Sequence, residues 1–511
     1  MHPTLSPYVI LAVLAVYFLV LVGVSRLTSR KSSNSTFFLA DRKAPWYLVA
    51  FGMIGASISG VTFISIPGKV GAGGLNMAFS YMQMVMGYFL GYLVIAGVLM
   101  PIYYRMNLIS IYTYLEERLG HFSYKTGAAF FLLSRTIGSA FRMYLVATVL
   151  QTFVLEPLGV PFPITAMIVV FLIWIYTYKG GANTVLWTDT LQTVFLLSAV
   201  WLTISAIGTA LEKSIPQLAT MVWNSEYSQM FFFKGGWSDP NNFFKQFVSG
   251  ALITIVMTGL DQDLMQKNLT CRNLSDARKN MLSFSVVLIF VNLSFLFLGA
   301  LLYLYAANLG IPIPVKSDML YPTIAFQYLS PVSSIIFILG LVAAAYASAD
   351  SALTSLTTSF CIDFLNFQKQ LPQPSYYEED VTAQQLVVED AQKKVRFKVH
   401  IGASVVLLLV IILFNIINKE AVINGLFEAA SYTYGPLLGL FSFGLITKWQ
   451  VKDRFVPWVC LASPVISYLI NFYSSSLLDG FKFGFLILAV NGFLTFIGLV
   501  LLRKKDTSAA I

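Results

Sequence analysis

Charged residues are scarce in this chain, because Asp, Glu, Lys and Arg together make up only 11% of its 511 residues. An average soluble chain carries about 25% charged residues. Hydrophobic residues account for 57% of the chain, and its mean hydropathy is +0.73. The composition therefore excludes an ordinary soluble globular protein and indicates a polytopic membrane protein.

Cysteine and histidine are almost missing as well, with three of each. The cysteines, Cys271, Cys361 and Cys460, lack the spacing of metal ligands and predict neither a disulfide framework nor a zinc site. No Gly-x-x-x-x-Gly-Lys-Ser/Thr loop occurs, which argues against a nucleotide-driven pump.

The histidines form no cluster with nucleophiles or acids; they are His2, at the N-terminus, and His121 and His400, near predicted helix ends. A membrane-embedded enzyme is therefore disfavoured, and we predict no catalytic residues. A transporter-like sensor is disfavoured too, because no signalling domain follows the basic run at Arg503.

Long apolar runs are abundant, and about 20 apolar residues suffice for a helix to cross a bilayer. Thirteen spans are predicted, near residues 8–27, 46–68, 75–103, 124–153, 161–178, 183–211, 246–266, 281–306, 321–365, 397–417, 421–446, 455–474 and 481–502. The stretch 321–365 is too long for one straight crossing, so we expect it to continue past the membrane surface.

The odd number of spans places the termini on opposite sides of the membrane. With the N-terminus outside, twenty-four of the 33 lysines and arginines fall on inward segments and seven on outward ones, as the positive-inside rule requires. The net charge of +9 thus follows from topology and needs no nucleic-acid partner. We predict a multi-pass protein of the cell (inner) membrane with a cytoplasmic C-terminus. Residues 1–7 lack the basic start of a signal peptide, so the first span is expected to stay uncleaved.

The second span is crowded with residues that weaken a helix. Residues 52–68 hold Gly52, Gly55, Gly60, four hydroxyl residues, Pro67 and Gly68. Small residues in membrane helices often serve only close packing. Transporters, however, use broken helices at the bilayer midplane, where freed carbonyls bind sodium. We expect a break here and a weaker counterpart in residues 246–266.

Asp189 lies inside a predicted span, in the sequence Trp187–Gln192 (WTDTLQ). An aspartate at the centre of a membrane helix costs roughly 2.5–3.5 kcal/mol on insertion scales, so it is a functional candidate by default. A cation is its natural partner. The alternative is a buried carboxylate that only fastens helices through hydrogen bonds.

Six short motifs, in this order, resemble the sodium:solute symporter family, which includes sodium/proline, sodium/galactose and sialic acid symporters. They are Phe37–Arg42 (FFLADR), Ala56–Gly60 (ASISG) with Pro67-Gly68, Tyr114–Gly120 (YLEERLG), Gly180-Gly181 with Trp187–Asp189 and Gln192, Gly259–Gln262 (GLDQ) with Gln266, and Gly435–Gly439 (GPLLG). The resemblance runs from about Phe37 to Thr447. It implies an all-α fold with a five-plus-five inverted repeat of the leucine-transporter type.

On this resemblance the chain divides into four parts. Residues 1–45 form the first helix and a cytoplasmic loop, 46–211 the first repeat, 212–446 the second repeat, and 447–511 two C-terminal helices and a tail. The polar segment 367–395 within the second repeat is interpreted as a solvated cytoplasmic linker.

The resemblance also implies sodium ligands. These are the backbone carbonyls of Gly55 and Ile58, the carbonyl of Ala344 and the hydroxyl of Ser348, which suit a hard cation that prefers oxygen. The family pattern has a hydroxyl where this chain has Ala347.

A second sodium site in some relatives corresponds here to Asp189, Asp350 and Ser351, with Asp350 where those relatives use serine. The two acids either hold a second sodium or couple a proton. For Asp350, as for Asp189, a purely structural role stays open.

Solute-lining positions implied by the resemblance are Ser59, Thr62, Tyr81, Thr254, Met257 and Glu428. Arg135 and Arg142, seven residues apart on one helix face, offer a planar fork suited to carboxylate, and we predict Arg135 as the solute ligand. The alternative is an internal ion pair of either arginine with Glu428 or Asp350.

The prediction from sequence is therefore a symporter that imports a small polar organic solute with Na⁺ by alternating access and is functional as a monomer in the lipid bilayer. A sugar or sugar acid is favoured over an amino acid or another carboxylate. Proton coupling and inorganic-anion transport are the alternatives within the same fold.

Overall fold

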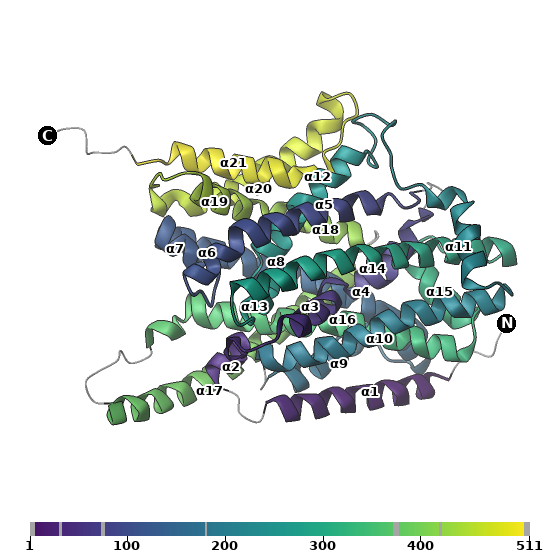
Figure 1. Ribbon diagram of the computed structural model, residues 1–511, viewed down its shortest axis with the longest axis horizontal. Coiled ribbons are helices and arrows are strands. Elements are labelled where there is room, and N and C mark those ends of the chain that lie inside the picture. Colours follow the sequence, from purple (N-terminus) through teal and green to yellow (C-terminus); the bar gives the residue numbers. More distant parts are fainter. Residues whose placement is uncertain are drawn as a thin grey trace.

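The computed structural model describes residues 6–29, 33–72, 77–178, 181–370, 378–417 and 422–504. Within these residues the chain is helical, with only two isolated bridges of extended backbone. The predicted all-α class is confirmed. The long helices run roughly side by side along the longest dimension of the molecule (Figure 1).

Each of the thirteen predicted spans has helices in the structure. The long apolar helices are α1 (Pro7–Thr28), α5 (Tyr81–Val94) continued by α6 (Met100–Arg105), α8 (His121–Leu150), α10 (Gly181–Ala210), α14 (Leu274–Leu309), α16 (Pro331–Ser359), α17 (Glu378–Ile417), α20 (Val456–Leu477) and α21 (Ile487–Leu501). Shorter apolar helices are α9 (Phe162–Thr177) and α19 (Gly435–Ile446).

Two spans are broken. The first consists of α3 (Trp46–Ser57) and α4 (Gly60–Lys69), which meet at an angle of 58°. The second consists of α12 (Phe243–Thr254) with a π-helical turn (Ile255–Gly259), and α13 (Gln262–Leu269), which meet at 64°. Both expected breaks are therefore present, including the one that the sequence signalled only weakly.

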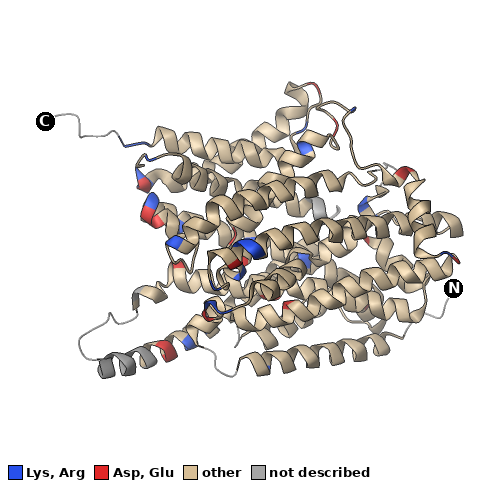
Figure 2. Cartoon of the chain, in the orientation of Figure 1, with Lys and Arg blue, Asp and Glu red and all other residues tan. Residues whose placement is uncertain are grey.

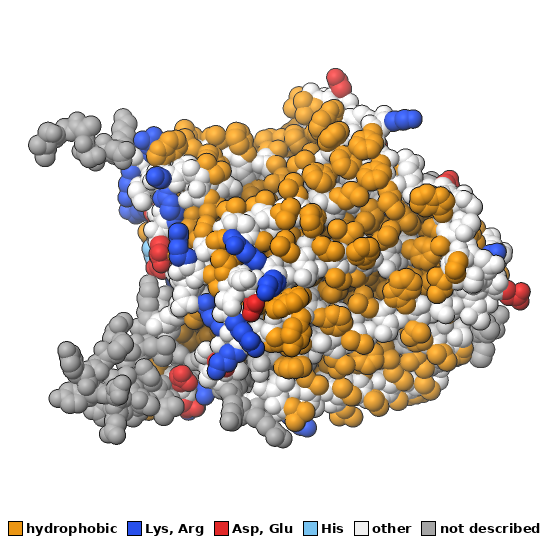
Figure 3. Space-filling view, in the orientation of Figure 1, with side chains coloured by type: hydrophobic (Ala, Val, Ile, Leu, Met, Phe, Trp, Pro, Cys, Tyr) orange, Lys and Arg blue, Asp and Glu red, His pale blue; other side chains and the backbone are white. Residues whose placement is uncertain are grey.

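Surface composition follows the expected membrane pattern. Hydrophobic side chains cover the middle of the molecule over a broad area (Figure 3). Lysines and arginines gather at the end that holds α6, α7 (Thr113–Arg118) and the last turn of α21 (Figure 2). The first residues of α1 and the last residues of α21 lie at opposite ends of the molecule (Figure 1).

The overlong stretch 321–365 is divided near its start. A short helix α15 (Leu320–Gln327) ends before Ser330, and α16 begins at Pro331. Ser330 caps α16 by accepting the Ser333 N–H at 3.3 Å, and proline at the first helical position needs no amide partner. The stretch 421–446 is divided as well, into α18 (Val422–Thr433) and α19, with Tyr434 between them.

The segment 367–395 differs from the solvated linker that we predicted. Residues 371–377 lie outside the described part, but α17 begins at Glu378, so the second half of the segment is helical. Gln392 is buried, accepts a hydrogen bond from Asn34 Nδ2 at 2.8 Å and donates one to the Phe367 carbonyl at 3.0 Å. Arg396 also donates to Asn34, at 2.7 Å. These contacts hold the middle of α17 against the N-terminal part of the chain.

Candidate cation and solute site

The break between α3 and α4 is built around Gly55. Its backbone N–H donates to Thr193 Oγ1 of α10 at 3.0 Å, and a Cβ at this position would collide with the same oxygen. Thr193 in turn donates to the Asp189 carbonyl at 2.7 Å. Only glycine therefore allows α3 to approach α10 this closely at the level of the break.

Helix α3 ends at Ser57, and the chain passes through Ile58, which is non-helical with φ −87° and ψ 87°, and through the extended Ser59 before α4 begins. Among the described residues, no backbone N–H donates to the carbonyl oxygen of Gly55 or of Ile58. Both carbonyls are predicted sodium ligands. An unpaired carbonyl in a buried segment is costly unless something binds it, so these two oxygens suit a cation.

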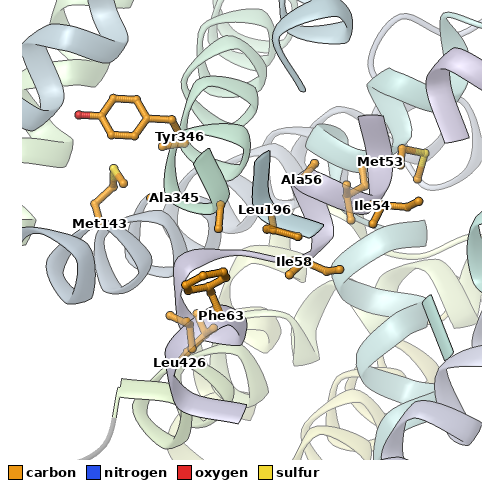
Figure 4. Close-up of a cluster of buried hydrophobic side chains, with 14 of the residues drawn as sticks. Met53, Ile54, Ala56, Ile58, Phe63, Met143, Leu196, Ala345, Tyr346 and Leu426 are labelled. Atoms are coloured by element: carbon orange, nitrogen blue, oxygen red, sulfur yellow. The ribbon is translucent and has the colours of Figure 1, made fainter. Parts of the chain in front are cut away.

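The break faces the middle of α16. An ideal Cβ on Gly55 would lie 3.5 Å from the Ala347 Cβ, and one on Gly60 would lie 3.6 Å from the Ala345 Cβ. Ile54, Ala56, Ile58 and Phe63 of the broken span share a buried cluster with Leu196 and Ala345 (Figure 4).

Ala344 and Ser348 are both fully buried on α16. Ser348 donates its hydroxyl hydrogen to the Ala345 carbonyl at 3.0 Å, which leaves its oxygen lone pairs for a cation. The structure thus brings the α16 segment that holds both predicted ligands against the break that holds the other two.

The second broken span is closed by tyrosines. Tyr103 donates to the Gly259 carbonyl and Tyr112 to the Leu260 carbonyl, each at 2.9 Å. Asp261 then caps α13 by accepting the Asp263 N–H at 2.8 Å. Unlike at the first break, the backbone carbonyls freed at this break accept hydrogen bonds from side chains.

Helix α13 connects several helices of the core. Asp263 forms an ion pair with Arg135 of α8 and accepts a hydrogen bond from Ser351 of α16. Asp261 accepts from the Tyr434 hydroxyl and lies 3.9 Å from Arg135. Arg135 therefore has an internal partner, but this partner is neither Glu428 nor Asp350, which were the candidates considered from the sequence.

Family-motif glutamines hold α13 in place. Gln262 accepts the Ile111 N–H at 2.9 Å and donates to the Ile109 carbonyl at 2.7 Å. Gln266 donates to the Phe38 carbonyl at 2.6 Å and to Thr358 Oγ1 at 3.0 Å. The position of this short helix is thus fixed by bonds to three other segments.

Asp189 and Asp350 lie together, as the resemblance implied. Both are fully buried, and Asp350 accepts a hydrogen bond from Thr188, the residue directly before Asp189 in the chain. Asp350 accepts from Tyr176 at 3.1 Å, from Thr188 at 3.3 Å and from the Ser351 N–H at 2.5 Å. A third charged group joins them, because the Lys267 ammonium of α13 forms an ion pair with Asp189.

A cavity of about 100 Å³ lies beside the first break. Its wall includes five of the predicted solute residues, namely Ser59, Thr62, Tyr81, Thr254 and Met257. Tyr88, Tyr92, Thr258 and Asn292 add further polar groups, and Leu426 and Phe427 of α18 close one side. Hydroxyl, amide and aromatic groups in this combination suit a small polar solute.

Arg142, and not Arg135, reaches this cavity. Arg135 lies about two helical turns before Arg142 on α8, beside α13, where Asp263 neutralises it. Glu428 is an exposed residue of α18 and is absent from the cavity wall, although its neighbour Phe427 is part of that wall.

Three residues that the structure places at these sites were not predicted. Lys267 directly follows the predicted span 246–266 and was therefore counted with the inward charges, Asp263 had no predicted role, and Arg142 was named only together with Arg135. The family motif at Gly259–Gln266 could have indicated Asp263 and Lys267. Asp263 lies within this motif, and Lys267 directly follows it.

Comparison with known proteins gives consistent matches. The family model described as "Sodium:solute symporter family" matches residues 37–448. The sodium/sialic acid symporter NanT of Aliivibrio fischeri is 23% identical over 450 residues, which cover 84% of this chain and 80% of that protein. The sodium/glucose cotransporter of Vibrio parahaemolyticus is 25% identical over 395 residues, which cover 70% of this chain and 68% of that protein.

A solved structure shares the fold. The substrate-bound, outward-open structure of a Na⁺-coupled sialic acid symporter, which is described as revealing a novel Na⁺ site, superposes with a TM-score of 0.77. The match has 18% sequence identity and covers 97% of this chain and 98% of that one.

Proposed function

Because the chain belongs to the sodium:solute symporter family, we propose that it imports a small polar solute that carries a carboxylate, and that a sugar acid is the favoured class. Arg142 in the cavity wall is the observation on which this proposal depends. The solute is drawn inward by sodium that binds at the break between α3 and α4.

Family membership confirms the coarser predictions from the sequence. The protein is a multi-pass, sodium-coupled solute symporter and not an enzyme. The all-helical fold of the leucine-transporter type is confirmed by its structural neighbours.

Arg142 supports an anionic solute for three reasons. The guanidinium lies in the wall of the cavity, and its Nε has no hydrogen-bond partner. Within the described residues no acidic side chain forms an ion pair with Arg142. A buried guanidinium without a counter-ion is costly, and a solute carboxylate would supply both the charge and a bidentate acceptor.

Neighbouring groups support a polyhydroxylated solute over a bare anion. Ser59 and Thr62 come from the start of α4, Thr254 from α12, and Tyr81 and Tyr88 from α5, so hydrogen-bonding groups surround the cavity on several sides. Tyr81 and Tyr88 bond each other through their hydroxyls at 2.8 Å. An inorganic anion would use the charge of Arg142 but would leave most of these groups without a function.

Coupling to sodium is explained by the position of the break. Gly55 and Ile58 lie on the same short segment as Ser59, which lines the solute cavity. Sodium bound by the two carbonyls, Ala344 and Ser348 would fasten this segment to α16. A sodium ion that enters the cell down the membrane potential releases about 2.3 kcal/mol of free energy per 100 mV. Each ion therefore supplies free energy for solute accumulation.

The topology favours an N-terminus outside and a cytoplasmic C-terminus, because the end of the molecule rich in lysine and arginine is also the end where α21 finishes. The proposal places the protein in the cell (inner) membrane. It also takes the monomer as the functional unit, because the sodium ligands and the cavity residues all come from one chain.

A thermal-shift screen of the purified protein, with and without sodium, tests the solute class. N-acetylneuraminate, glucuronate, glucose, proline and iodide would be compared. We expect the sugar acids to raise the melting temperature only in sodium, and Arg142→Ala to remove this shift. Arg105→Ala, at an exposed arginine of α6, is the matched control and should keep it.

Uptake into proteoliposomes then tests the direction and the coupling ion, with sodium and proton gradients imposed separately. A proton gradient that drives uptake without sodium would contradict sodium coupling. Glucose or iodide that stabilises wild type and Arg142→Ala equally well would contradict the carboxylate.

A further inference from the structure

A second cavity, larger than the solute cavity, lies between α1, α8, α9 and α16. Its volume is about 450 Å³. Part of its wall comes from the end of α8 and from the π-helical turn that follows it (Gln151–Leu155). Figure 1 shows α1 and α9 side by side at the edge of the molecule. The cavity is therefore separate from the cation and solute site.

The cavity follows the length of two helices. On α1 its wall runs from Leu11 to Val22, with lining residues every three or four positions, which form one face of a helix. On α9 the wall runs from Thr165 to Ile175 in the same pattern. At 1.5 Å per residue these stretches are about 16 and 15 Å long. This length is about half of the hydrocarbon core of a bilayer, which is about 30 Å thick, and so matches the depth of one leaflet.

The wall of this cavity is almost entirely apolar. Thr165 and Tyr346 are its only residues with a polar side-chain atom. The Thr165 hydroxyl donates to Gln151 Oε1, and the Tyr346 hydroxyl donates to the Val169 carbonyl at 3.1 Å. A buried water molecule needs about 2–4 polar partners, and the other side chains of the wall offer none. An apolar molecule is therefore the occupant that suits this cavity.

The mouth of the cavity lies on the apolar surface of the protein. Leu19 of α1 and Ile168 of α9 belong to the wall and are also 71% and 41% exposed. Residues 7–25 of α1 include no charged side chain, and hydrophobic side chains cover the middle of the molecule (Figure 3). Since the chain belongs to a family of multi-pass membrane proteins, this surface faces the bilayer, and lipid chains are the molecules that reach the mouth.

From the length, the apolar wall and the position of the mouth, we propose that this cavity binds one acyl chain of a membrane phospholipid. The proposal goes beyond sodium-coupled symport and needs no particular solute. Leu11 lies about one turn after the start of α1. With the N-terminus outside, the bound chain belongs to a lipid of the outer leaflet.

The bound chain packs against the helix that carries two predicted sodium ligands. Val342 and Tyr346 of α16 both line the cavity. They lie two residues before Ala344 and Ser348, respectively. Tyr346 also contacts Phe18 of α1, with the ring centroids 4.9 Å apart. An empty cavity deprives its wall of van der Waals partners on one side, so we expect the phospholipid to raise the melting temperature of the protein.

Photo-crosslinking of the full-length protein in lipid nanodiscs tests the proposal. The probe is a phosphatidylethanolamine with a diazirine near the middle of one acyl chain, and peptide mass spectrometry locates the cross-links. We expect labelling of Val342 and Tyr346, which are each only 1% exposed and are out of reach of lipid that merely surrounds the protein. The same phospholipid with the diazirine on its head group should label neither residue.

A variant that fills the cavity provides the decisive comparison. Ala15 has the smallest side chain of the wall, and Ala15→Trp should remove the labelling of Val342 and Tyr346. Val16→Trp is the matched control, because Val16 is the next residue of α1, is 63% exposed and is not part of the wall. It should keep the labelling of wild type.

A second pair of variants covers the case in which Ala15→Trp fails to fold, as judged by size-exclusion chromatography. Leu172→Trp fills the cavity from α9 and should likewise remove the labelling. Phe171→Trp is its control, at an exposed neighbour outside the wall.

Three outcomes would overturn the proposal. They are no labelling of Val342 and Tyr346 in wild type, labelling of these residues by the head-group probe, and equal labelling in a folded cavity-filling variant and its control. The sodium-dependent shift in melting temperature is measured on the same wild-type protein. Its absence would contradict the proposed function and leave the acyl-chain site in place.

Discussion

Arg135 forms an ion pair with Asp263, and this contact joins α8 to the second half of the second broken span. Both side chains are buried, with 3% and 1% exposure, and Asp261 lies 3.9 Å from the same guanidinium. The arginine that we had predicted to bind solute is thus neutralised within the protein.

This pairing gives the first prediction, for Arg135→Ala. Removal of one partner of a buried ion pair costs about 3–5 kcal/mol, because the other charge is left uncompensated. We expect a large fall in melting temperature with every solute and in its absence. Asp263→Asn combined with Arg135→Met, which removes both charges, should recover most of the loss.

Fluorescence-detected size-exclusion chromatography after heating is the measurement, with Arg105→Ala as the exposed control. An Arg135→Ala protein of normal thermal stability that loses only the carboxylated solutes would show that Arg135 binds solute after all.

The sequence predicted the broken helices but not this network, and the difference has a physical cause. Density of glycine, hydroxyl residues and proline along 52–68 is a local property, and it predicts a local break. The contacts of Lys267 with Asp189 and of Arg135 with Asp263 join residues 78 and 128 positions apart. The hydrophobic periodicity of a sequence carries no information on contacts between residues that lie so far apart along the chain.

The two arginines of α8 illustrate the same limit. Their spacing of seven residues places them on one face, which periodicity shows correctly, but periodicity assigns no partner to either. In the structure the two arginines have different neighbours. Asp263 of α13 pairs with Arg135, whereas Arg142 lines the cavity. A count of inward charges likewise assigned Lys267 to a loop, since it cannot distinguish a loop lysine from one that turns back into the protein.

Gly55→Ala should abolish sodium binding. The added Cβ would collide with Thr193 Oγ1 and would lie 3.4 Å from the Asp189 carbonyl oxygen, so α3 must move away from α10 and carry the Gly55 carbonyl with it. Sodium-dependent stabilisation, measured as the shift in melting temperature between sodium and potassium buffers, should disappear.

Gly97→Ala is the matched control, because a Cβ there meets nothing within 4 Å. The prediction fails if Gly55→Ala keeps the sodium-dependent shift of wild type.

A hydroxyl at position 347 should tighten sodium binding. An ideal Cβ on Gly55 would lie 3.5 Å from the Ala347 Cβ, so Ala347→Ser would add an oxygen beside the predicted ligands. A hydrogen bond or contact to a charged group contributes about 1.5–3 kcal/mol, which corresponds to at least a tenfold change in affinity.

Sodium titration of intrinsic fluorescence measures this affinity, and Ser348→Ala should shift it in the opposite direction by a similar factor. An Ala347→Ser protein with weaker sodium binding would place the cation elsewhere.

Cys271 offers a test of packing next to α13. It lies in the short connection between α13 and α14 with no exposed surface, and its backbone N–H donates to the Asn268 carbonyl at 3.2 Å. Burial raises the pKa of the Cys271 thiol to about 12, against about 8.5 for a free cysteine. At pH 8 the folded protein therefore holds only about one thiolate in ten thousand at this position, and the thiolate is the reactive form.

A variant with Cys361→Ala and Cys460→Ala isolates this thiol for alkylation by iodoacetamide, followed by intact-protein mass spectrometry. We expect negligible labelling of the folded protein at pH 8 and labelling that rises as the pH approaches 11, whereas protein denatured in detergent should react fully at pH 8. Rapid labelling of the folded protein at pH 8 would mean that the connection after α13 opens to water. In that case the anchored position of Lys267 would have to be reconsidered, because the same short helix holds both residues in place.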